Sequence, residues 1–269
     1  MKSQALCSWA ESKPFRFLVG SEGREFVIHG ALIAAQSPAL NALVNNGMQE
    51  SREGCVSWPQ CDVETFVRFL EYVYTGDFES PMALTHDLGG ESESAEEHAD
   101  AKVPKPFEIR QAVWDNFVYW LDREYTSHTL YYMQWHPEGD GDDALVAIAK
   151  VYMLADYYGV DRLARLCMFK LCELLVDTQE RPSLGGLINL VELCIVEQCP
   201  TRLRKFVLEY SAFHLHPLVG EEKFQQLAKE HPSALLEILG QFMVFIGDDG
   251  FEGAEADGDA SKTKGQDKQ

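Results

Sequence analysis

The stretch that decides the fold is EFVIHGALIAAQSPALNALVNNGMQES, residues 25–51. It opens with an alternation of polar and apolar residues, which is typical of a half-buried strand, and continues into two short apolar patterns separated by Ser37 and Pro38. A residue that precedes proline is pushed out of the helical region, so the first pattern should stop at Ser37. Because Pro38 suits the first turn of a helix and serine is a preferred N-cap, this pair predicts a cap between two helices.

His29 lies where the predicted strand ends, and two interpretations compete for it. Paired with Ser37 or Cys55 it could activate a nucleophile, but that chemistry needs an orienting carboxylate and an exposed turn, which the sequence does not indicate. The other interpretation is a buried, hydrogen-bonded side chain that fixes the corner between strand and helix. We predict this structural role, and we expect the loss of the His29 side chain to lower the melting temperature.

Further strands are predicted on both sides of this stretch. Residues 15–20 and 24–29 are β-type runs separated by Ser-Glu-Gly, a spacing that suits a hairpin. Residues 55–58, CVSW, predict a third strand.

A longer helix is predicted after Asp62, which can act as its N-cap, and Thr-Gly-Asp at residues 75–77 ends it. Its apolar residues predict a broad buried face at positions 63, 66, 67, 69, 70, 73 and 74.

The later part of the chain carries helical patterns. Residues 142–175 predict a helical hairpin in which Gly159 supplies the left-handed stop, and the first half is apolar nearly all round, as in a helix enclosed by others. Residues 183–246 contain three more helical patterns, with Pro232 breaking the last pair. Together these elements predict an α+β fold that is predominantly helical, with short strands beside a helical cluster and an additional C-terminal helical region.

Composition divides the chain further. The residues after 78 are acidic, serine-rich and almost without aromatics, which predicts a flexible insertion, and the aromatic-rich stretch behind it should be ordered. The predicted division is an N-terminal segment (1–13), the first part of the core (14–78), an acidic disordered insertion (79–106), an aromatic-rich ordered insertion (107–141), the closing helical hairpin (142–176), the C-terminal helical region (177–246) and a disordered acidic tail (247–269).

Charge and composition exclude several classes of partner. The formal net charge of −20 repels phosphate backbones and anionic lipid, so we expect neither nucleic acid nor membrane as a partner. No segment reaches the roughly 20 apolar residues of a membrane span, and the N-terminus lacks a signal-peptide pattern. The seven cysteines are irregularly spaced, which favours free thiols in a reducing compartment. We expect an intracellular protein, either cytoplasmic or nuclear.

Four possible zinc ligands occur near the C-terminus: Cys194, Cys199, His214 and His216. Cys-x4-Cys followed by His-x-His departs from the common zinc spacings, and both cysteines belong to apolar helical patterns. We therefore predict that they are packing residues and that the chain holds no metal.

Two other candidate ligand sites also have a structural explanation. The acidic run at 138–144 has the composition of a calcium loop but lacks its bidentate glutamate, so a solvated loop is the preferred interpretation. The aromatic residues at 107–135 could line a ligand pocket, although their helical spacing favours core packing. Because G-x-S-x-G, Walker A, G-x-G-x-x-G and H-E-x-x-H are all absent from the sequence, we predict no catalytic residue, no cofactor and no enzyme.

The order of these elements resembles the BTB/POZ domain, and most closely the BTB proteins common in filamentous fungi. The motifs that carry the resemblance are FLVG, FVIH, ALIAAQSP and NGMQES within residues 17–51, F…YVYTG at 66–76, and AKVYMLADYYGVDRLARLCMFKL at 149–171. The resemblance covers most of residues 14–240. It implies a structural role for the motif residues His29, Ser37, Pro38, Tyr74, Gly76 and Gly159.

The resemblance implies a non-catalytic domain that forms homodimers or binds other proteins. Some members are substrate adaptors of cullin-type ubiquitin ligases, and others are transcriptional co-regulators. For an adaptor, the cullin would contact the helix at 63–74 and the hairpin after Gly159. The candidate partner-binding residues on that helix are Phe69, Leu70 and Tyr72.

Two positions depart from the family pattern. Many members place aspartate immediately before the first strand and lysine or arginine after the histidine, where the two form a charged pocket at the dimer interface. Pro14 and Gly30 stand at the matching positions here. The departure weakens the transfer of a co-repressor groove to this chain.

Overall fold

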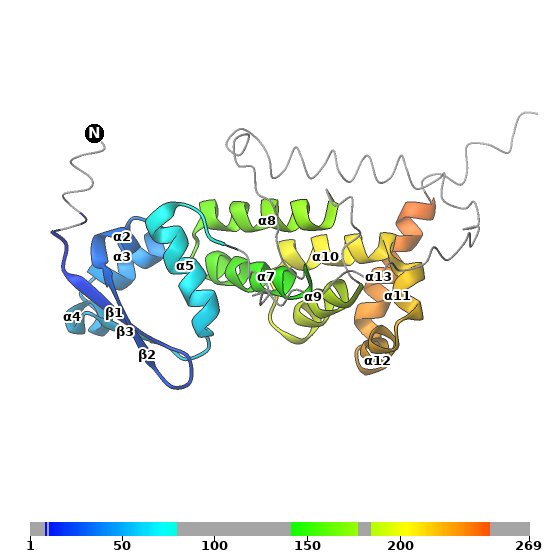
Figure 1. The fold of residues 1–269 in the computed structure, drawn as a ribbon, viewed down its shortest axis with the longest axis horizontal. Helices are drawn as coiled ribbons and strands as arrows, with labels where there is room; N and C mark the ends of the chain where they lie inside the picture. The colour runs from blue at the N-terminus through cyan, green and yellow to red at the C-terminus, as the bar shows by residue number, and fades with distance from the viewer. Residues whose placement is uncertain (1–8, 10, 80–140, 177–183, 248–269) are drawn as a thin grey trace, which may run out of the picture.

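The computed structural model describes residues 9, 11–79, 141–176 and 184–247. The structure describes only residues 79, 141 and 247 of the predicted insertions at 79–106 and 107–141 and of the predicted tail at 247–269. A small sheet occupies one end of the molecule, a helical hairpin lies in the middle, and the later helices extend to the other end (Figure 1). The α+β fold expected from the sequence is confirmed.

Three strands form one sheet in the order β2-β1-β3: β1 (Pro14–Val19), β2 (Arg24–His29) and β3 (Cys55–Trp58). The central strand β1 pairs antiparallel with β2 and parallel with β3. All three strands agree with the sequence prediction to within one residue. Their side chains alternate between the two faces, so the apolar residues of one parity point into the core.

The core beneath the sheet is built from aromatic rings. Phe17 of β1 lies 4.9 Å from Trp58 and 5.2 Å from Phe66, measured between ring centroids, and Trp58 meets Phe66 edge to face at 5.6 Å. Full burial of one such ring stabilises the fold by roughly 1.5–3 kcal/mol, and ring pairs add about 0.5–1.5 kcal/mol. This cluster fixes the long helix that contains Phe66 against the sheet.

Within residues 11–79, the helices that accompany the sheet are α2 (Gly30–Ala34), α3 (Pro38–Asn45), α4 (Gln49–Glu53) and α5 (Val63–Thr75). The short helix α4 was not predicted. Gly76 caps the C-terminus of α5 at φ 85°, in the left-handed region that favours glycine.

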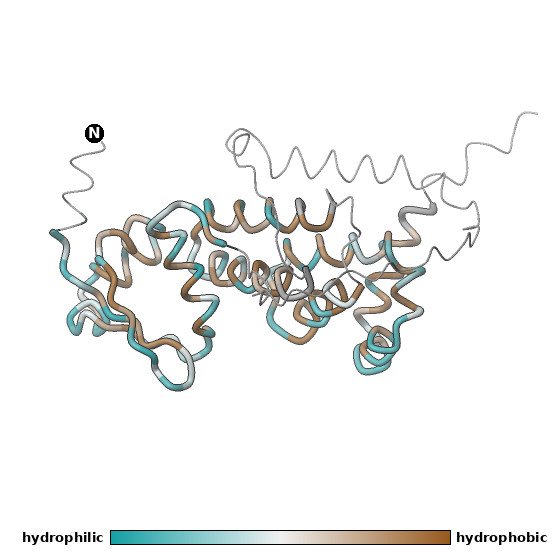
Figure 2. The backbone as a smooth tube through the Cα atoms, viewed as in Figure 1, coloured by the Kyte–Doolittle hydropathy of each residue, from teal (hydrophilic) through white to brown (hydrophobic). Residues whose placement is uncertain are grey.

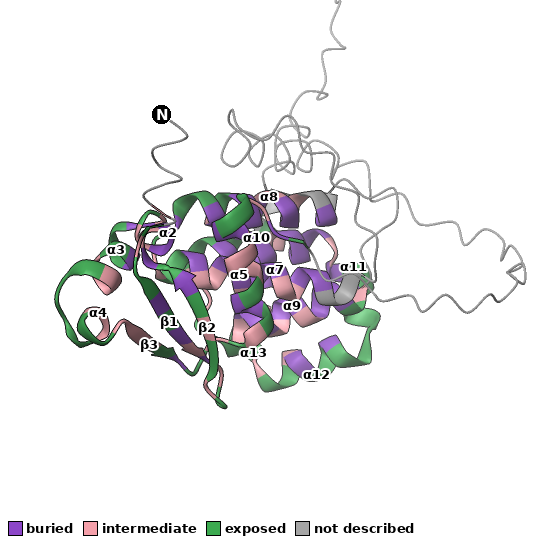
Figure 3. Ribbon diagram, turned by 60° about the vertical axis from the view of Figure 1, so that its left-hand side comes forward, coloured by how far each residue is buried: buried purple, intermediate pink, exposed green. Residues whose placement is uncertain are grey.

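The buried face of α5 is narrower than the sequence suggested. Phe66, Phe69 and Val73 are buried, whereas Val67 is 43% exposed and Tyr74 is 52% exposed. The predicted face covered too much of the helix circumference, because α5 carries both buried and exposed residues along its length (Figure 3).

The closing hairpin consists of α7 (Gly141–Tyr157) and α8 (Asp161–Val176). Gly159, at φ 65°, forms the turn between them. None of the α7 residues 144–155 is exposed, because α5, α8 and α9 pack around this helix. The apolar pattern of α7 correctly predicted an enclosed helix.

The C-terminal region contains more helices than the three predicted: α9 (Leu184–Val196), α10 (Thr201–Phe213), α11 (Leu215–Gly220), α12 (Glu222–Glu230) and α13 (Pro232–Gly247). Pro232 begins α13, as expected of a proline that separates two helices. The hydrophobic residues run along α7, α8 and α9, while α12 is largely hydrophilic (Figure 2). Buried residues gather where α7, α9 and α10 meet (Figure 3). Among the described residues, no helix combines the length and hydropathy needed to cross a bilayer.

Candidate protein-interaction surfaces

His29 lies on the surface, so the prediction that its side chain is buried was wrong. Its neighbour Ile28 points into the core and is 1% exposed, and strand alternation then turns His29 to the solvent side. The Nδ1 atom of His29 lies 3.4 Å from the hydroxyl oxygen of Tyr74, at the end of α5. This long, exposed hydrogen bond joins the end of β2 to the end of α5 and provides no catalytic arrangement.

Ser37 links two distant parts of the chain. It is the N-cap of α3, where its Oγ accepts a hydrogen bond from the Leu40 amide at 3.1 Å. The same hydroxyl donates to the carbonyl oxygen of Tyr158 at 2.6 Å, across 121 positions of sequence. The Tyr158 ring stacks on Trp58 at 4.3 Å between centroids. Through these contacts, Ser37 and Trp58 hold the turn of the α7–α8 hairpin against the part of the core formed by the sheet and α3.

A second anchor holds α8 to the segment that follows α5. The Nζ atom of Lys170, whose side chain is 3% exposed, lies 2.9 Å from a carboxylate oxygen of Asp77 and donates to the Phe78 carbonyl at 2.9 Å. The ammonium group also lies 4.9 Å from the centre of the Phe78 ring. A buried lysine needs such partners, because its charge is costly to remove from water.

The proposed partner-binding residues of α5 do not form a common surface. Phe69 is 1% exposed and Tyr72 is 7% exposed, so both belong to the core, and Leu70 alone of the three is partly accessible. The prediction that these three residues bind a partner together is therefore corrected, because two of them are buried. The helical period places Phe69 and Tyr72 on the side of α5 that faces the sheet and the hairpin.

The accessible side of α5 carries a different set of apolar residues. We call Val67, Leu70 and Tyr74 the α5 ridge, since spacings of three and four place them on one helix face. Val27 of β2, which is 59% exposed, adds an apolar side chain on the solvent side of the sheet. Alternation in FVIH pointed to Val27 and His29 as outward residues, but nothing in the sequence distinguished the exposed part of α5 from its buried part.

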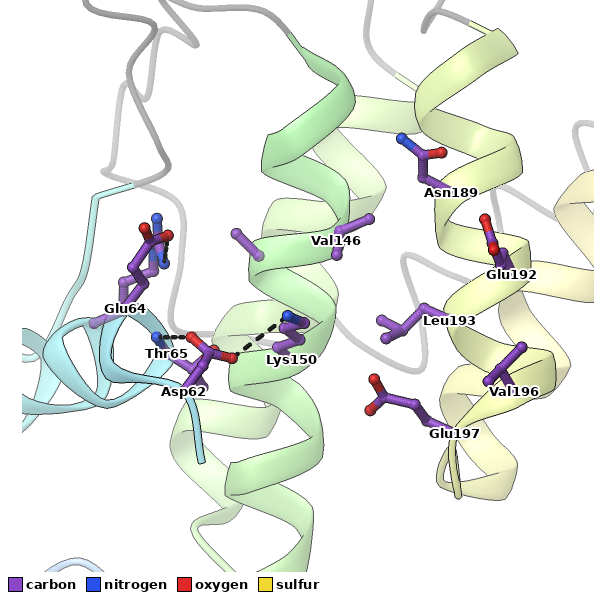
Figure 4. Close-up of a pocket in the computed structure, with 12 residues that line it drawn as sticks. Asp62, Glu64, Thr65, Val146, Lys150, Asn189, Glu192, Leu193, Val196 and Glu197 are labelled. Carbon is purple, nitrogen blue, oxygen red and sulfur yellow. Dashed lines mark hydrogen bonds and ion pairs between the residues drawn. The ribbon is translucent and has the colours of Figure 1, made fainter. Parts of the chain in front are cut away.

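A groove of about 750 Å³ lies between α5, α7 and α9 (Figure 4). Apolar side chains from α7 and α9 line part of it: Val146, Ala147, Leu193 and Val196. The charged lining residues are Asp62, Glu64, Glu192 and Glu197, against Arg68 and Lys150. None of the described lining residues is a histidine, cysteine or serine. The groove thus combines an apolar part with an excess of carboxylates.

Asp62 organises the groove at the start of α5. One carboxylate oxygen accepts a hydrogen bond from the Thr65 amide at 2.8 Å, and the other lies 3.4 Å from the Nζ atom of Lys150 on α7. Burial by itself would raise the pKa of Asp62, but the hydrogen bonds from Thr65 and the positive charge of Lys150 outweigh it and lower that pKa. Asp62 is therefore both the cap of α5 and a link from α5 to α7.

The four possible zinc ligands do not meet. Cys194 and Cys199 lie together, with their sulfur atoms 3.4 Å apart, but His214 stacks on Tyr210 and His216 is exposed at the start of α11. Within the described residues, no group of three or more histidine, cysteine or acidic side chains is arranged to hold a metal ion.

Two further candidate ligand sites, for which the sequence analysis preferred a structural explanation, lie largely outside the described residues. The aromatic residues at 107–135 lie outside the described residues. The same holds for the acidic run at 138–144, except that α7 begins at Gly141, so the end of the run is helical rather than a loop.

Comparison with known proteins agrees with this architecture. Residues 15–89 match the BTB/POZ domain family. The chain is similar to TD and POZ domain-containing protein 3 of Mus musculus, with 32% identity over 66 residues, which cover 24% of this chain and 18% of that protein. It is also similar to TD and POZ domain-containing protein 2 of Mus musculus, with 29% identity over 66 residues and the same coverage. The match spans less than a fifth of either relative.

The match to residues 15–89 shows the class of this part of the chain, a protein–protein interaction module. The module is a BTB/POZ domain, present at residues 15–89. Residues beyond 89 also contribute to the same packed unit, because Tyr158 and Lys170 contact Ser37, Trp58 and Asp77.

Proposed function

We propose that this chain is a non-catalytic interaction protein that binds another polypeptide, a second copy of itself or a different protein, through the α5 ridge. The observation that carries the proposal is the exposure of Val67 and Tyr74, at 43% and 52%, on a helix whose other side is packed in the core. Large apolar side chains that gather on one exposed helix face mark an interaction surface. We also propose that the chain belongs to the filamentous-fungal subgroup of BTB proteins, whose sequence the motif at 149–171 resembles.

The net charge of −20 makes self-association dependent on salt. Two copies repel each other at low ionic strength, whereas about 0.15 M salt screens charges separated by more than roughly 8 Å. A homodimer held by the apolar ridge should therefore strengthen as salt is raised. A complex with a basic partner should weaken under the same change.

Light scattering coupled to gel filtration on the full chain, at low and at physiological salt, tests the proposal. We expect a dimer, and we expect the double substitution Val67→Glu and Tyr74→Glu to convert it to a monomer without loss of helical circular dichroism. The control is Val219→Glu, which places one of these two negative charges on an exposed valine of α11, 50% exposed, and should leave the dimer intact.

If the unaltered chain is a monomer at both salt concentrations, affinity purification from the native cell decides between a different partner and none. The wild-type chain and the Val219→Glu control should then retain a partner that the ridge variant loses. A monomeric chain with no partner that depends on the ridge would refute the proposal.

A substrate adaptor for a cullin-type ubiquitin ligase is the second candidate. The observation that favours it is the contact of the hairpin turn with the core, where Tyr158 meets Ser37 and Trp58. The adjacent Tyr157 is 79% exposed beside that turn. α5 and the hairpin, the two elements that such an adaptor would use, thus belong to one packed unit. Binding of a purified cullin N-terminal domain at micromolar concentration, lost with Tyr157→Ala or with the ridge variant, would support this role. No binding at that concentration would remove it.

A transcriptional co-regulator that uses a charged pocket at the dimer interface is not favoured. A Cβ atom added at Gly30 would lie 3.0 Å from the Lys13 carbonyl oxygen and 3.3 Å from a methyl carbon of Val44. The backbone at residue 30 is therefore too closely packed to accept lysine or arginine without a local shift.

A further inference from the structure

Two cysteines are in contact at the junction between the end of α9 and the start of α10. Cys194 belongs to the last turn of α9 and is fully buried, while Cys199 is partly exposed in the short non-helical segment before Pro200, the N-cap of α10. Their sulfur atoms lie 3.4 Å apart, within hydrogen-bond distance. Both thiols are free in this structure, so the protein holds a reduced dithiol at this junction.

Arg204 lies beside this pair and is itself held in place. Its Nη1 atom donates to the carbonyl oxygen of Cys194 at 2.8 Å, and the rest of its guanidinium forms a two-pronged ion pair with Glu237 of α13 at 3.0–3.1 Å. A fixed positive charge next to a sulfur atom favours its thiolate form. The start of α10, which Cys199 directly precedes, favours a negative charge in the same way.

The two thiols are therefore unequal. The hydrogen bond between the two thiols, the charge of Arg204 and a hydrogen bond from the Arg204 backbone lower the pKa of Cys199, against the opposing effects of burial and of Glu197. The hydrogen bond to Cys199 and burial raise the pKa of Cys194. By contrast, burial raises the pKa of Cys61 to about 12 and that of Cys167 well above its ordinary value. Cys199 is thus the more nucleophilic member of the pair, and Cys194 keeps its proton beside it.

We propose that Cys194 and Cys199 form an oxidisable dithiol that hydrogen peroxide converts to an intramolecular disulfide. The Cys199 thiolate attacks one peroxide oxygen, the O–O bond breaks, and the departing hydroxide takes a proton, which leaves a sulfenic acid on Cys199 and one water molecule. The Cys194 sulfur then attacks the Cys199 sulfur, the S–O bond breaks, and the leaving hydroxide takes the Cys194 proton as a second water. The dithiol loses two electrons, and hydrogen peroxide gains them.

The local structure allows this closure. The sulfur atoms must approach from 3.4 Å to about 2.05 Å, and the non-helical segment that carries Cys199 can supply the movement without unwinding α9 or α10. A thiol reductant would reverse the bond, which is compatible with free thiols in a reducing compartment. The disulfide would tie α9 to α10 next to Arg204, whose ion pair with Glu237 joins α10 to α13.

Peptide mapping after peroxide treatment tests the proposal directly. The folded chain is treated with hydrogen peroxide, its remaining thiols are alkylated, and it is cleaved after glutamate under denaturing, non-reducing conditions. Because Glu197 lies between the two cysteines, cleavage there separates them unless a disulfide holds the two peptides together. We expect that linked pair in the treated chain, together with the loss of two alkylatable thiols, and recovery of both thiols after reduction.

Variants identify the order of attack. Cys194→Ser should trap the sulfenic acid on Cys199, detected by its reaction with dimedone, and Cys199→Ser should abolish both the link and the dimedone adduct. Cys172→Ser, a control at a partly exposed cysteine of α8, should leave the link unchanged. Circular dichroism checks that each variant is folded.

Mapping of the wild-type chain decides the outcome even if a variant misfolds. The proposal is overturned if the Cys194 and Cys199 peptides separate after a peroxide dose that oxidises other cysteines of the chain. It is equally overturned if either cysteine is linked only to a third cysteine or to a second molecule.

Discussion

The Ser37 hydroxyl donates a hydrogen bond to the Tyr158 carbonyl at 2.6 Å while it accepts one from the Leu40 amide at 3.1 Å. One small side chain thus caps α3 and fastens the hairpin turn, 121 residues away in sequence. The BTB/POZ match ends at residue 89, so this contact joins the recognised domain to a part of the chain beyond it.

We expect Ser37→Ala to lower the free energy of unfolding by about 1–3 kcal/mol. Loss of an N-cap costs about 0.5–2 kcal/mol, and the unpaired Tyr158 carbonyl adds part of a desolvation penalty. Chemical denaturation measures the change. Ser57→Ala, the same substitution at an exposed position of β3, is the control and should change stability by less than about 0.5 kcal/mol. Equal effects of the two substitutions would show that Ser37 has no special role.

The charge and the capping role of Asp62 can be separated by two substitutions. Asp62→Asn keeps an oxygen that can cap α5 but loses the ion pair with Lys150, whereas Asp62→Ala loses both. We expect Asp62→Ala to cost about 1 kcal/mol, and Asp62→Asn clearly less, because exposed ion pairs contribute little. Thermal or urea unfolding near neutral pH compares the two. If the alanine and asparagine variants are equally stable, the cap contributes nothing measurable.

The same aspartate should give a defined pH dependence. The folded state lowers the pKa of Asp62 below its ordinary value of 3.8, so the folded protein favours the charged form. The resulting stabilisation is complete above the ordinary value and is lost as pH falls through the lower, folded-state pKa. The stability difference between the wild-type chain and Asp62→Asn should therefore be constant near neutral pH and shrink below about pH 4. A difference that grew on acidification would contradict the direction of the shift.

Local signals in the sequence account for what was predicted correctly. Ser37 with Pro38, Asp62 and Gly76 each set a helix end, so the start of α3 and both ends of α5 followed from a few neighbouring residues. The error at His29 was also local. The alternation that places Ile28 in the core turns His29 outward, and that pattern was present in FVIH.

What the sequence did not supply depends mainly on long-range contacts. The partner of the Ser37 hydroxyl and the burial of Lys170 against Phe78 each require the packed structure. The same holds for α5, where a broad apolar pattern did not reveal which part the sheet and the hairpin would cover. Phe69 and Tyr72 were consequently placed on a partner surface, whereas Val67 and Tyr74 occupy the exposed side. The contact of Cys194 with Cys199, five positions apart, depends instead on how the chain turns after the end of α9.

Two lysine–aspartate pairs differ in burial and should differ in energy. Lys170 is 3% exposed and pairs with Asp77, whereas Lys150 is 38% exposed and pairs with Asp62. We expect Lys170→Met to lower the free energy of unfolding by about 3 kcal/mol, because it leaves Asp77 and the Phe78 carbonyl without their buried partner. Lys150→Met should cost less than about 1 kcal/mol. Urea denaturation of both variants measures the contrast, and similar losses would contradict the role of burial.

We predict that His29 and Tyr74 contribute little to stability and that Tyr74 contributes to binding. Their 3.4 Å contact is exposed, so we expect His29→Ala and Tyr74→Ala each to change the free energy of unfolding by about 0.5 kcal/mol or less, in place of the larger loss expected for a buried histidine. Tyr74→Ala should nevertheless weaken association through the α5 ridge by roughly tenfold or more, since aromatic residues often dominate such surfaces. Calorimetry gives the first quantity and sedimentation equilibrium or partner titration the second. A Tyr74→Ala chain that melts well below the wild type yet associates normally would place this tyrosine in the fold and not in the interface.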